Sequence, residues 1–167
     1  MNGIHLTRRQ LPGLLAMTLA AAALAACSGD DDNDAGFGLT GWPDGGSITL
    51  SDYAGEGGGP VVVNFLATWC PNCMEEMDVL QAVHASGVAV LGVNLRESAG
   101  TVSKLLADTG ATFPIGLDET GKVTRAYKVV NLPGTAVLRG DGTIATVIRG
   151  PITEESLLEA VRAAEGG

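Results

Sequence analysis

The chain has 167 residues, 46% of them hydrophobic, and a formal net charge of −9. This length is typical of a single domain, and the hydrophobic content suffices for one core. The balance of 19 acidic against 10 basic residues argues against nucleic acid as a partner.

The first 26 residues have the pattern of a secretory signal peptide. Arg8 and Arg9 precede an Ala/Leu-rich apolar run from Leu11 to Ala26. A membrane-spanning helix would need about 20 apolar residues, so the run is interpreted as an export signal. The paired arginines are also similar to a twin-arginine signal, and both export routes stay open.

Cys27 lies in the context Leu24-Ala25-Ala26-Cys27, which resembles the bacterial lipoprotein processing box. The resemblance implies cleavage before Cys27 and attachment of lipid to that residue. The alternative is an ordinary signal peptide in which a cysteine happens to lie beside the cut.

Residues 27–40 are predicted to form the lipidated cysteine and a flexible acidic tether. Residues 28–40 show neither a strand period nor a helix period, and four of them are aspartates. The folded domain is then expected at 41–167. We expect a location outside the cytoplasm, in the periplasm or at the cell surface, where disulfide chemistry is available.

The folded part opens with a predicted strand, helix and strand. Val61 to Leu66 is an almost continuous apolar run, typical of a strand covered on both faces. Apolar residues then recur at helical spacing from Pro71 to His84, and Gly87 ends that helix. Val88 to Val93 is a second buried strand, so a parallel pair with a right-handed crossover is expected.

The remainder alternates between helices and strands, which favours an α/β sandwich with a mixed sheet. The last helix begins at Thr153 with an incomplete capping signal, because position 156 is Ser rather than an acid. The other expected elements are helices at 98–109 and 120–127 and an antiparallel hairpin of strands 136–139 and 143–149.

Cys70 and Cys73 form a Cys-x-x-Cys pair directly after the first buried strand. Half of a zinc site has this spacing, but outside the signal the chain offers only His84 as a further Cys or His ligand, apart from Cys27. We therefore predict no metal site. A structural disulfide is the next alternative, and a loop this short would make it an inefficient brace.

Position favours redox chemistry over bracing. Cys70 is expected at a strand end and helix start, with Pro71 in the first turn, where backbone N–H groups and the helix dipole stabilise a thiolate. Cys73 lies one turn further in. This asymmetry predicts that Cys70 attacks a substrate disulfide and that Cys73 resolves the mixed disulfide.

The segment from Val61 to Cys73, V-V-V-N-F-L-A-T-W-C-P-N-C, resembles the active-site segment of the thioredoxin superfamily. The match is specifically to its TlpA/ResA-like branch of membrane-tethered bacterial thiol-disulfide oxidoreductases. It covers nearly all of 45–164, including an entry segment at 47–55, an inserted strand at 112–118 and the approach to a cis-proline loop at 126–135. The resemblance implies a thioredoxin-like three-layer α/β/α sandwich with a mixed central sheet.

The same resemblance implies the substrate-binding residues. Pro133 would be the cis-proline beside the disulfide, and the backbone of Leu132 would pair with an extended substrate. Trp69 and Pro71 complete the expected binding surface. An ordinary turn over 131–134 is the alternative for the proline segment.

Asn64 and Glu76 distinguish this chain from thioredoxin itself. Asn64 occupies the position of thioredoxin's buried acid, and an amide cannot transfer the proton. Glu76 matches an acid implicated in cytochrome-maturation relatives, so the resemblance implies a catalytic role for it beside Cys70 and Cys73. The alternative is a solvated helix glutamate, which is what we expect of Glu75.

The resulting prediction is an extracytoplasmic protein disulfide reductase, with apocytochrome c as the leading substrate. Asn72 supplies no charge between the cysteines, which favours a reducing poise. A membrane electron donor of the DsbD/CcdA type would re-reduce the protein, which is expected to be a monomer without a cofactor. The alternatives are a disulfide oxidant or isomerase and a chaperone for copper or oxidase assembly.

Overall fold

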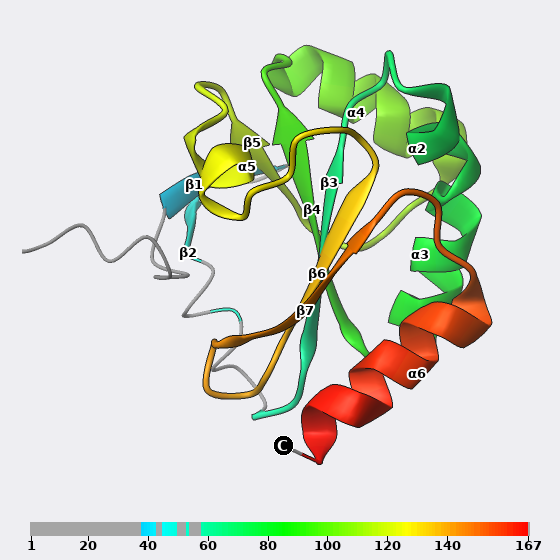
Figure 1. The fold of residues 1–167 in the computed structure, drawn as a ribbon. Coiled ribbons are helices and arrows are strands. Elements are labelled where there is room, and N and C mark those ends of the chain that lie inside the picture. Colours follow the sequence, from blue (N-terminus) through cyan, green and yellow to red (C-terminus); the bar gives the residue numbers. More distant parts are fainter. Residues whose placement is uncertain (1–37, 43–44, 50–52, 54–57, 167) are drawn as a thin grey trace, which may run out of the picture. The chain divides into compact units, whose positions relative to one another are not determined.

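The structure, a computed structural model, describes residues 38–42, 45–49, 53 and 58–166 (Figure 1). Cys27, the predicted signal and residues 27–37 of the predicted tether lie outside the described residues. The strands are β1 Gly38–Trp42, β2 Ser47–Thr49, β3 Val61–Leu66, β4 Ala89–Leu95, β5 Ile115–Asp118, β6 Gly134–Leu138 and β7 Ile144–Arg149. The helices are α2 Pro71–Glu75, α3 Met77–Ala85, α4 Ala99–Thr109, α5 Lys122–Ala126 and α6 Glu154–Glu165.

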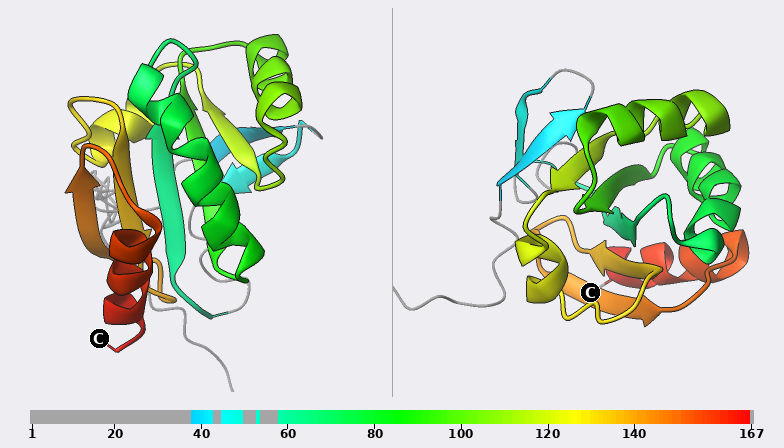
Figure 2. Two further views of the ribbon diagram at one scale, coloured as in Figure 1. Left: turned by 90° about the vertical axis from the view of Figure 1, so that its right-hand side faces the viewer. Right: turned by 90° about the horizontal axis from the view of Figure 1, so that it is seen from above.

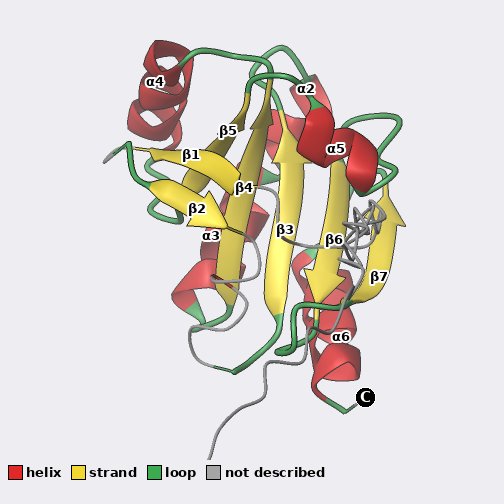
Figure 3. Ribbon diagram, turned by 90° about the vertical axis from the view of Figure 1, so that its left-hand side faces the viewer, coloured by secondary structure: helices red, strands yellow, loops and turns green. Residues whose placement is uncertain are grey.

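The strands form one mixed sheet in the order β2-β1-β5-β4-β3-β6-β7 (Figure 3). β3, β4 and β5 are parallel neighbours, as expected for strands joined by helical crossovers. β6 is antiparallel to β3 and β7 is antiparallel to β6, so the predicted hairpin is present. β1 is antiparallel to β5 at the other side of the sheet.

Alternation along β3 divides the core between the two faces of the sheet. Val62 and Leu66 pack with α3, α4 and α6 on one face. Val61, Val63 and Phe65 pack with α5 on the other face. Asn64 shares the parity of Val62 and Leu66 and therefore belongs to the face that α3 covers.

The helices cover the two faces unequally. The chain steps from β3 to β4 to β5 in one direction, so two right-handed crossovers place α3 and α4 on the same face. α6 joins them there, whereas α5 packs on the opposite face (Figures 2 and 3). The predicted three-layer α/β/α sandwich with a mixed sheet is confirmed.

Two predicted boundaries are wrong. The helix expected without interruption over 71–84 is two helices, separated at Glu76. The domain begins before residue 41, since Gly38, Leu39 and Thr40 lie in β1, paired with both β2 and β5. The tether boundary at residue 40 missed this strand because the segment is too short and too rich in glycine to show a period.

The capping signal of α6 is complete rather than partial. Ser156 N–H donates to Thr153 Oγ1 at 3.2 Å, and Thr153 N–H donates to Ser156 Oγ at 3.0 Å. A serine hydroxyl therefore takes the role that an acid has in the usual capping box.

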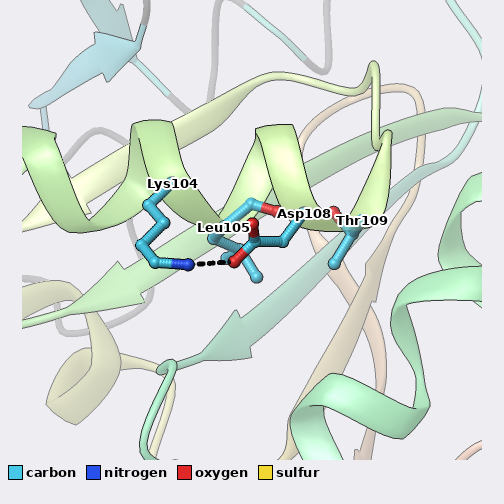
Figure 4. Close-up of polar contacts among 4 residues, drawn as sticks. All are labelled: Lys104, Leu105, Asp108 and Thr109. Carbon is cyan, nitrogen blue, oxygen red and sulfur yellow. Dashed lines mark hydrogen bonds and ion pairs between the residues drawn. The ribbon is translucent and has the colours of Figure 1, made fainter.

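α4 begins at the N-cap Ser98 and ends at Gly110, whose φ of 67° is the left-handed conformation that glycine adopts without strain. Lys104 and Asp108 form an exposed ion pair on this helix, and Thr109 Oγ1 donates to Leu105 O at 2.8 Å (Figure 4). Such a pair contributes at most a few tenths of a kcal/mol. Among the described residues, no helix has the length and apolar character needed to cross a bilayer.

Candidate active site

A tight turn carries the chain from β3 into the Cys-x-x-Cys motif. Cys70 N–H donates to Ala67 O at 3.1 Å, which closes the turn Ala67–Cys70. The turn leaves Trp69 64% exposed. β3 is parallel to β4, so the motif lies at the edge where the carboxyl ends of the parallel strands meet, near the top of Figure 3.

Cys70 and Cys73 form a disulfide with their Cα atoms 5.3 Å apart. Cys70 is the N-cap of α2 with Pro71 in the first turn, and its Sγ accepts the N–H of Cys73 at 3.3 Å. Cys70 is 6% exposed and Cys73 is fully buried. A backbone donor is thus aimed at the sulfur that is more accessible to a substrate, as the sequence predicted.

The loop before β6 lies beside the motif. Phe65 pairs with Gly134, so the preceding Pro133 lies next to the end of β3, a few residues from Cys70. The Leu132–Pro133 peptide bond is cis. Leu132 is half-buried against the cluster that contains both cysteines, and Pro133 is buried.

Glu76 is 3% exposed and is joined to two distant segments. Its Oε2 accepts from Asn64 Nδ2 at 3.3 Å, and its Oε1 accepts from Ile152 N–H at 2.9 Å. Asn64 Nδ2 also donates to Thr135 Oγ1 at 3.0 Å. The neighbouring Glu75 is exposed, in agreement with its interpretation as a solvated glutamate.

Burial raises the pKa of Glu76 above its ordinary value, because desolvation disfavours the charged carboxylate. The hydrogen bonds from Ile152 N–H and Asn64 oppose this effect without cancelling it. A carboxyl group with a raised pKa is suited to exchange protons nearer to neutral pH than an ordinary glutamate is.

Sequence reasoning missed Glu97, which lies on the same edge. Its Oε2 accepts from Thr68 N–H at 2.8 Å, and its Oε1 accepts from Thr68 Oγ1 at 2.6 Å. The available signal was its place just after β4, whose carboxyl end meets that of β3. Thr135 and Ile152 were missed because only the tertiary fold brings Thr135 to Asn64 and Ile152 to Glu76.

In the described part of the chain, no group of three or more His, Cys, Asp or Glu side chains could hold a metal ion. The disulfide is the redox centre that these residues provide. A Cys-x-x-Cys disulfide at the carboxyl end of a central parallel strand, in a three-layer sandwich, defines a thiol-disulfide oxidoreductase of thioredoxin-like fold.

Comparison with known proteins supports this class. Residues 35–147 match the family model described as the AhpC/TSA family. The thiol-disulfide oxidoreductase ResA of Geobacillus kaustophilus is 36% identical over 120 residues, which cover 68% of this chain and 67% of ResA. The chain therefore belongs to the AhpC/TSA family, and within it to the TlpA/ResA-like thiol-disulfide oxidoreductases.

Solved structures agree with this assignment. MTB DsbF superposes with a TM-score of 0.70 at 26% identity, covering 80% of this chain and 99% of DsbF. StoA from Bacillus subtilis superposes with a TM-score of 0.63 at 26% identity, covering 74% of this chain and 94% of StoA. The predicted family and fold are thus confirmed.

Proposed function

We propose that this protein is an extracytoplasmic reductase of protein disulfides, held at a membrane by lipid on Cys27. The observation that carries the reductase proposal is the position of Cys70 at the N-cap of α2, with its sulfur receiving a backbone N–H and lying beside the cis-proline loop. The signal and processing box in the sequence support the location.

The exchange proceeds in two balanced steps. In the reduced protein the Cys70 thiolate attacks one sulfur of a substrate disulfide, forming a mixed disulfide and releasing a substrate thiolate. Cys73 then attacks Cys70 Sγ, which releases the second substrate thiol and leaves the Cys70–Cys73 disulfide. Two electrons have passed from the protein to the substrate.

Glu76 takes part as the acceptor of the Cys73 proton in the second step. It lies three residues after Cys73, hence on the same side of the helical segment. Its raised pKa fits a group that gains and loses a proton during the cycle. While Glu76 is charged, its carboxylate opposes ionisation of the Cys73 thiol. Resolution therefore begins when Glu76 takes up the Cys73 proton.

Exposed apolar side chains support a protein substrate. Trp69 and Val130 are the exposed large hydrophobic residues of the described chain, at 64% and 85% exposure. Trp69 lies in the turn that ends at Cys70, and Val130 lies three residues before the cis-proline. Together with Pro71 and the backbone of Leu132, they form a surface suited to an extended polypeptide; apocytochrome c is the leading candidate.

Trapping tests the proposal directly. In the full chain, Cys73→Ser leaves Cys70 unable to release its substrate, so mixed disulfides should accumulate and apocytochrome c should be found among them. Cys70→Ser is the matched control and should trap nothing. Recovery of no partner, together with retained activity of Cys73→Ser, would contradict the exchange mechanism.

The reduction potential tests the direction of electron flow. A value near −270 mV, about that of thioredoxin, supports a reductase, and a membrane donor of the DsbD/CcdA type would then supply the electrons. A value near −120 mV, about that of a strong oxidant, would overturn the reducing assignment.

A further inference from the structure

Glu97 makes a bidentate contact with the turn that carries the reactive cysteine. One carboxylate oxygen accepts from Thr68 N–H at 2.8 Å, and the other accepts from Thr68 Oγ1 at 2.6 Å. Thr68 lies inside the Ala67–Cys70 turn, two residues before Cys70. The contact therefore fixes both the backbone and the side chain of the turn at one residue.

The Glu97 carboxylate also accepts a hydrogen bond from Asn94. Asn94 is fully buried, and its Nδ2 donates to Glu97 Oε2 at 2.8 Å. Asn94 is opposite Leu66 in the parallel ladder, so the contact lies directly beyond the last β3–β4 pair. A carboxylate has the acceptor capacity for all three donors.

The backbone beside Glu97 adopts a conformation that is uncommon for its residue type. Arg96 has a φ of 57°, in the left-handed region that a non-glycine residue seldom occupies. Ser98, on the other side, caps α4 by accepting Thr101 N–H at 3.3 Å. The short connection between β4 and α4 thus caps the helix and also places the Glu97 carboxylate against Thr68. Backbone in an uncommon conformation of this kind tends to occur at functional sites.

We propose that Glu97 is a positioning residue for thiol-disulfide exchange: it clamps Thr68 so that Trp69 and Cys70 are presented to a protein disulfide in a fixed geometry. This inference rests on the exchange reaction proposed above. Small losses of alignment at a reacting centre can cost up to about 10²-fold in rate, so loss of the clamp has a measurable effect.

Two substitutions separate geometry from charge. Glu97→Ala removes the clamp and the charge. Glu97→Gln removes the charge alone, since its amide oxygen can accept from Thr68 N–H and Asn94 while its amide nitrogen donates to Thr68 Oγ1. Glu75→Gln is the matched control, because Glu75 is exposed, close to the motif in sequence and outside the clamp.

The experiment measures the rate at which the reduced full chain reduces the disulfides of insulin, together with the pH profile of Cys70 alkylation by iodoacetamide. We expect Glu97→Ala to slow insulin reduction about tenfold. Glu97→Gln and Glu75→Gln should stay within about twofold of wild type. The alkylation profile should shift equally in Glu97→Ala and Glu97→Gln, because both remove the same charge.

Thr68→Val provides a milder test that does not depend on the folding of Glu97→Ala. It removes only the hydroxyl bond and should slow insulin reduction about threefold. In the Glu97→Ala background it should add no further loss, because the clamp is already absent.

Equal rates for wild type, Glu97→Ala and Thr68→Val would overturn the inference, as would a Glu97→Gln variant as slow as Glu97→Ala. If the wild type fails to reduce insulin, the reductase proposal fails instead. The clamp is then tested by the rate of Cys70 alkylation at a pH where the thiol is fully ionised in both variants. At that pH Glu97→Ala should differ from Glu97→Gln, and equal rates would overturn the inference.

Discussion

Glu76 connects three segments that are far apart in sequence. It lies between α2 and α3, accepts from Asn64 in β3 and accepts from Ile152 in the connection before α6. Its raised pKa follows from burial of a group that would be better solvated when charged. The same burial makes stability depend on the protonation of this one carboxyl group.

Replacement of Glu76 by Gln should change how stability responds to pH. Because the pKa of Glu76 is higher in the folded chain than the ordinary 4.5, the native state binds more protons than the unfolded state between those two values. The wild-type free energy of unfolding therefore falls as pH rises through that window. Glu76→Gln should lack this fall, and its stability relative to wild type should increase with pH.

Urea unfolding of both proteins at a series of pH values above 4.5 measures this difference. Glu75→Gln serves as the control and should follow wild type. Parallel curves for wild type and Glu76→Gln would contradict the raised pKa.

Asn64→Asp should show why an amide occupies this buried position. The new carboxyl group would lie where Asn64 Nδ2 is 3.3 Å from Glu76 Oε2, and two carboxylates at that distance cannot both be charged without a penalty. We expect a loss of about 3 kcal/mol at neutral pH. The loss should shrink toward pH 4, where the pair shares a proton.

The exposed Asn72→Asp is the matched control, and its effect should stay within about 0.5 kcal/mol. Free energies of unfolding at pH 4 and pH 7 distinguish the outcomes. A pH-independent loss in Asn64→Asp would point to packing rather than charge.

Much of this site could be predicted from local sequence, and the rest depends on tertiary contacts. The pairing of Cys70 with Cys73 and the N-cap position follow from a buried strand, a proline and a helical period in succession. The environment of Glu76 cannot be predicted from local sequence, since its hydrogen-bond partners lie 12 and 76 residues away in the chain. Glu97 was missed for the same reason, because its contact with Thr68 spans 29 residues.

At the scale of elements, the start of α6 shows how side-chain chemistry replaces the expected residue. The sequence pattern requires an acid at position 156, whereas the structure uses the Ser156 hydroxyl. Hydroxyls can both donate and accept, so Thr153 and Ser156 satisfy each other's backbone N–H groups. The sequence pattern therefore predicted the helix start correctly but took its capping box to be incomplete.

Thr153→Ala should lower the free energy of unfolding by about 1 kcal/mol, as is typical for loss of an N-cap. Ser156→Ala should cost less, and the double variant less than the sum, because the two residues act on the same pair of bonds. Glu159→Ala, exposed in the middle of α6, is the control. Strict additivity in urea unfolding would show that the two hydroxyls act independently.

At the scale of the whole domain, the strand order brings the chemistry to one edge. β3, β4 and β5 are parallel, so the connections after each of them lie on the same side of the sheet. The disulfide follows β3, Glu97 follows β4 and α5 follows β5, so all three lie at that edge of the sheet. The buried strands and their parallel pairing were predictable from continuous apolar runs, whereas β1 was not, because its segment is too short and too rich in glycine to show a period.

A chain that begins at residue 43 should test whether β1 belongs to the domain. Leu39 is 3% exposed, and a Cβ at Gly116 would come within 2.7 Å of its Cδ1, which shows how closely β1 packs on β5. Loss of this burial should cost about 2 kcal/mol or more. A chain that begins at residue 35 is the control, and equal urea midpoints for the two would restore the boundary near residue 41.

The bond from Ile152 N–H to Glu76 Oε1 has one more consequence. An amide proton that points at a carboxylate changes its resonance frequency when that carboxylate gains a proton, so Ile152 is a natural NMR probe of Glu76. If Glu76 accepts the Cys73 proton, the signal should move on reduction of the disulfide as well as on titration. A single backbone resonance, far from the cysteines in sequence, would then report both acidity and redox state.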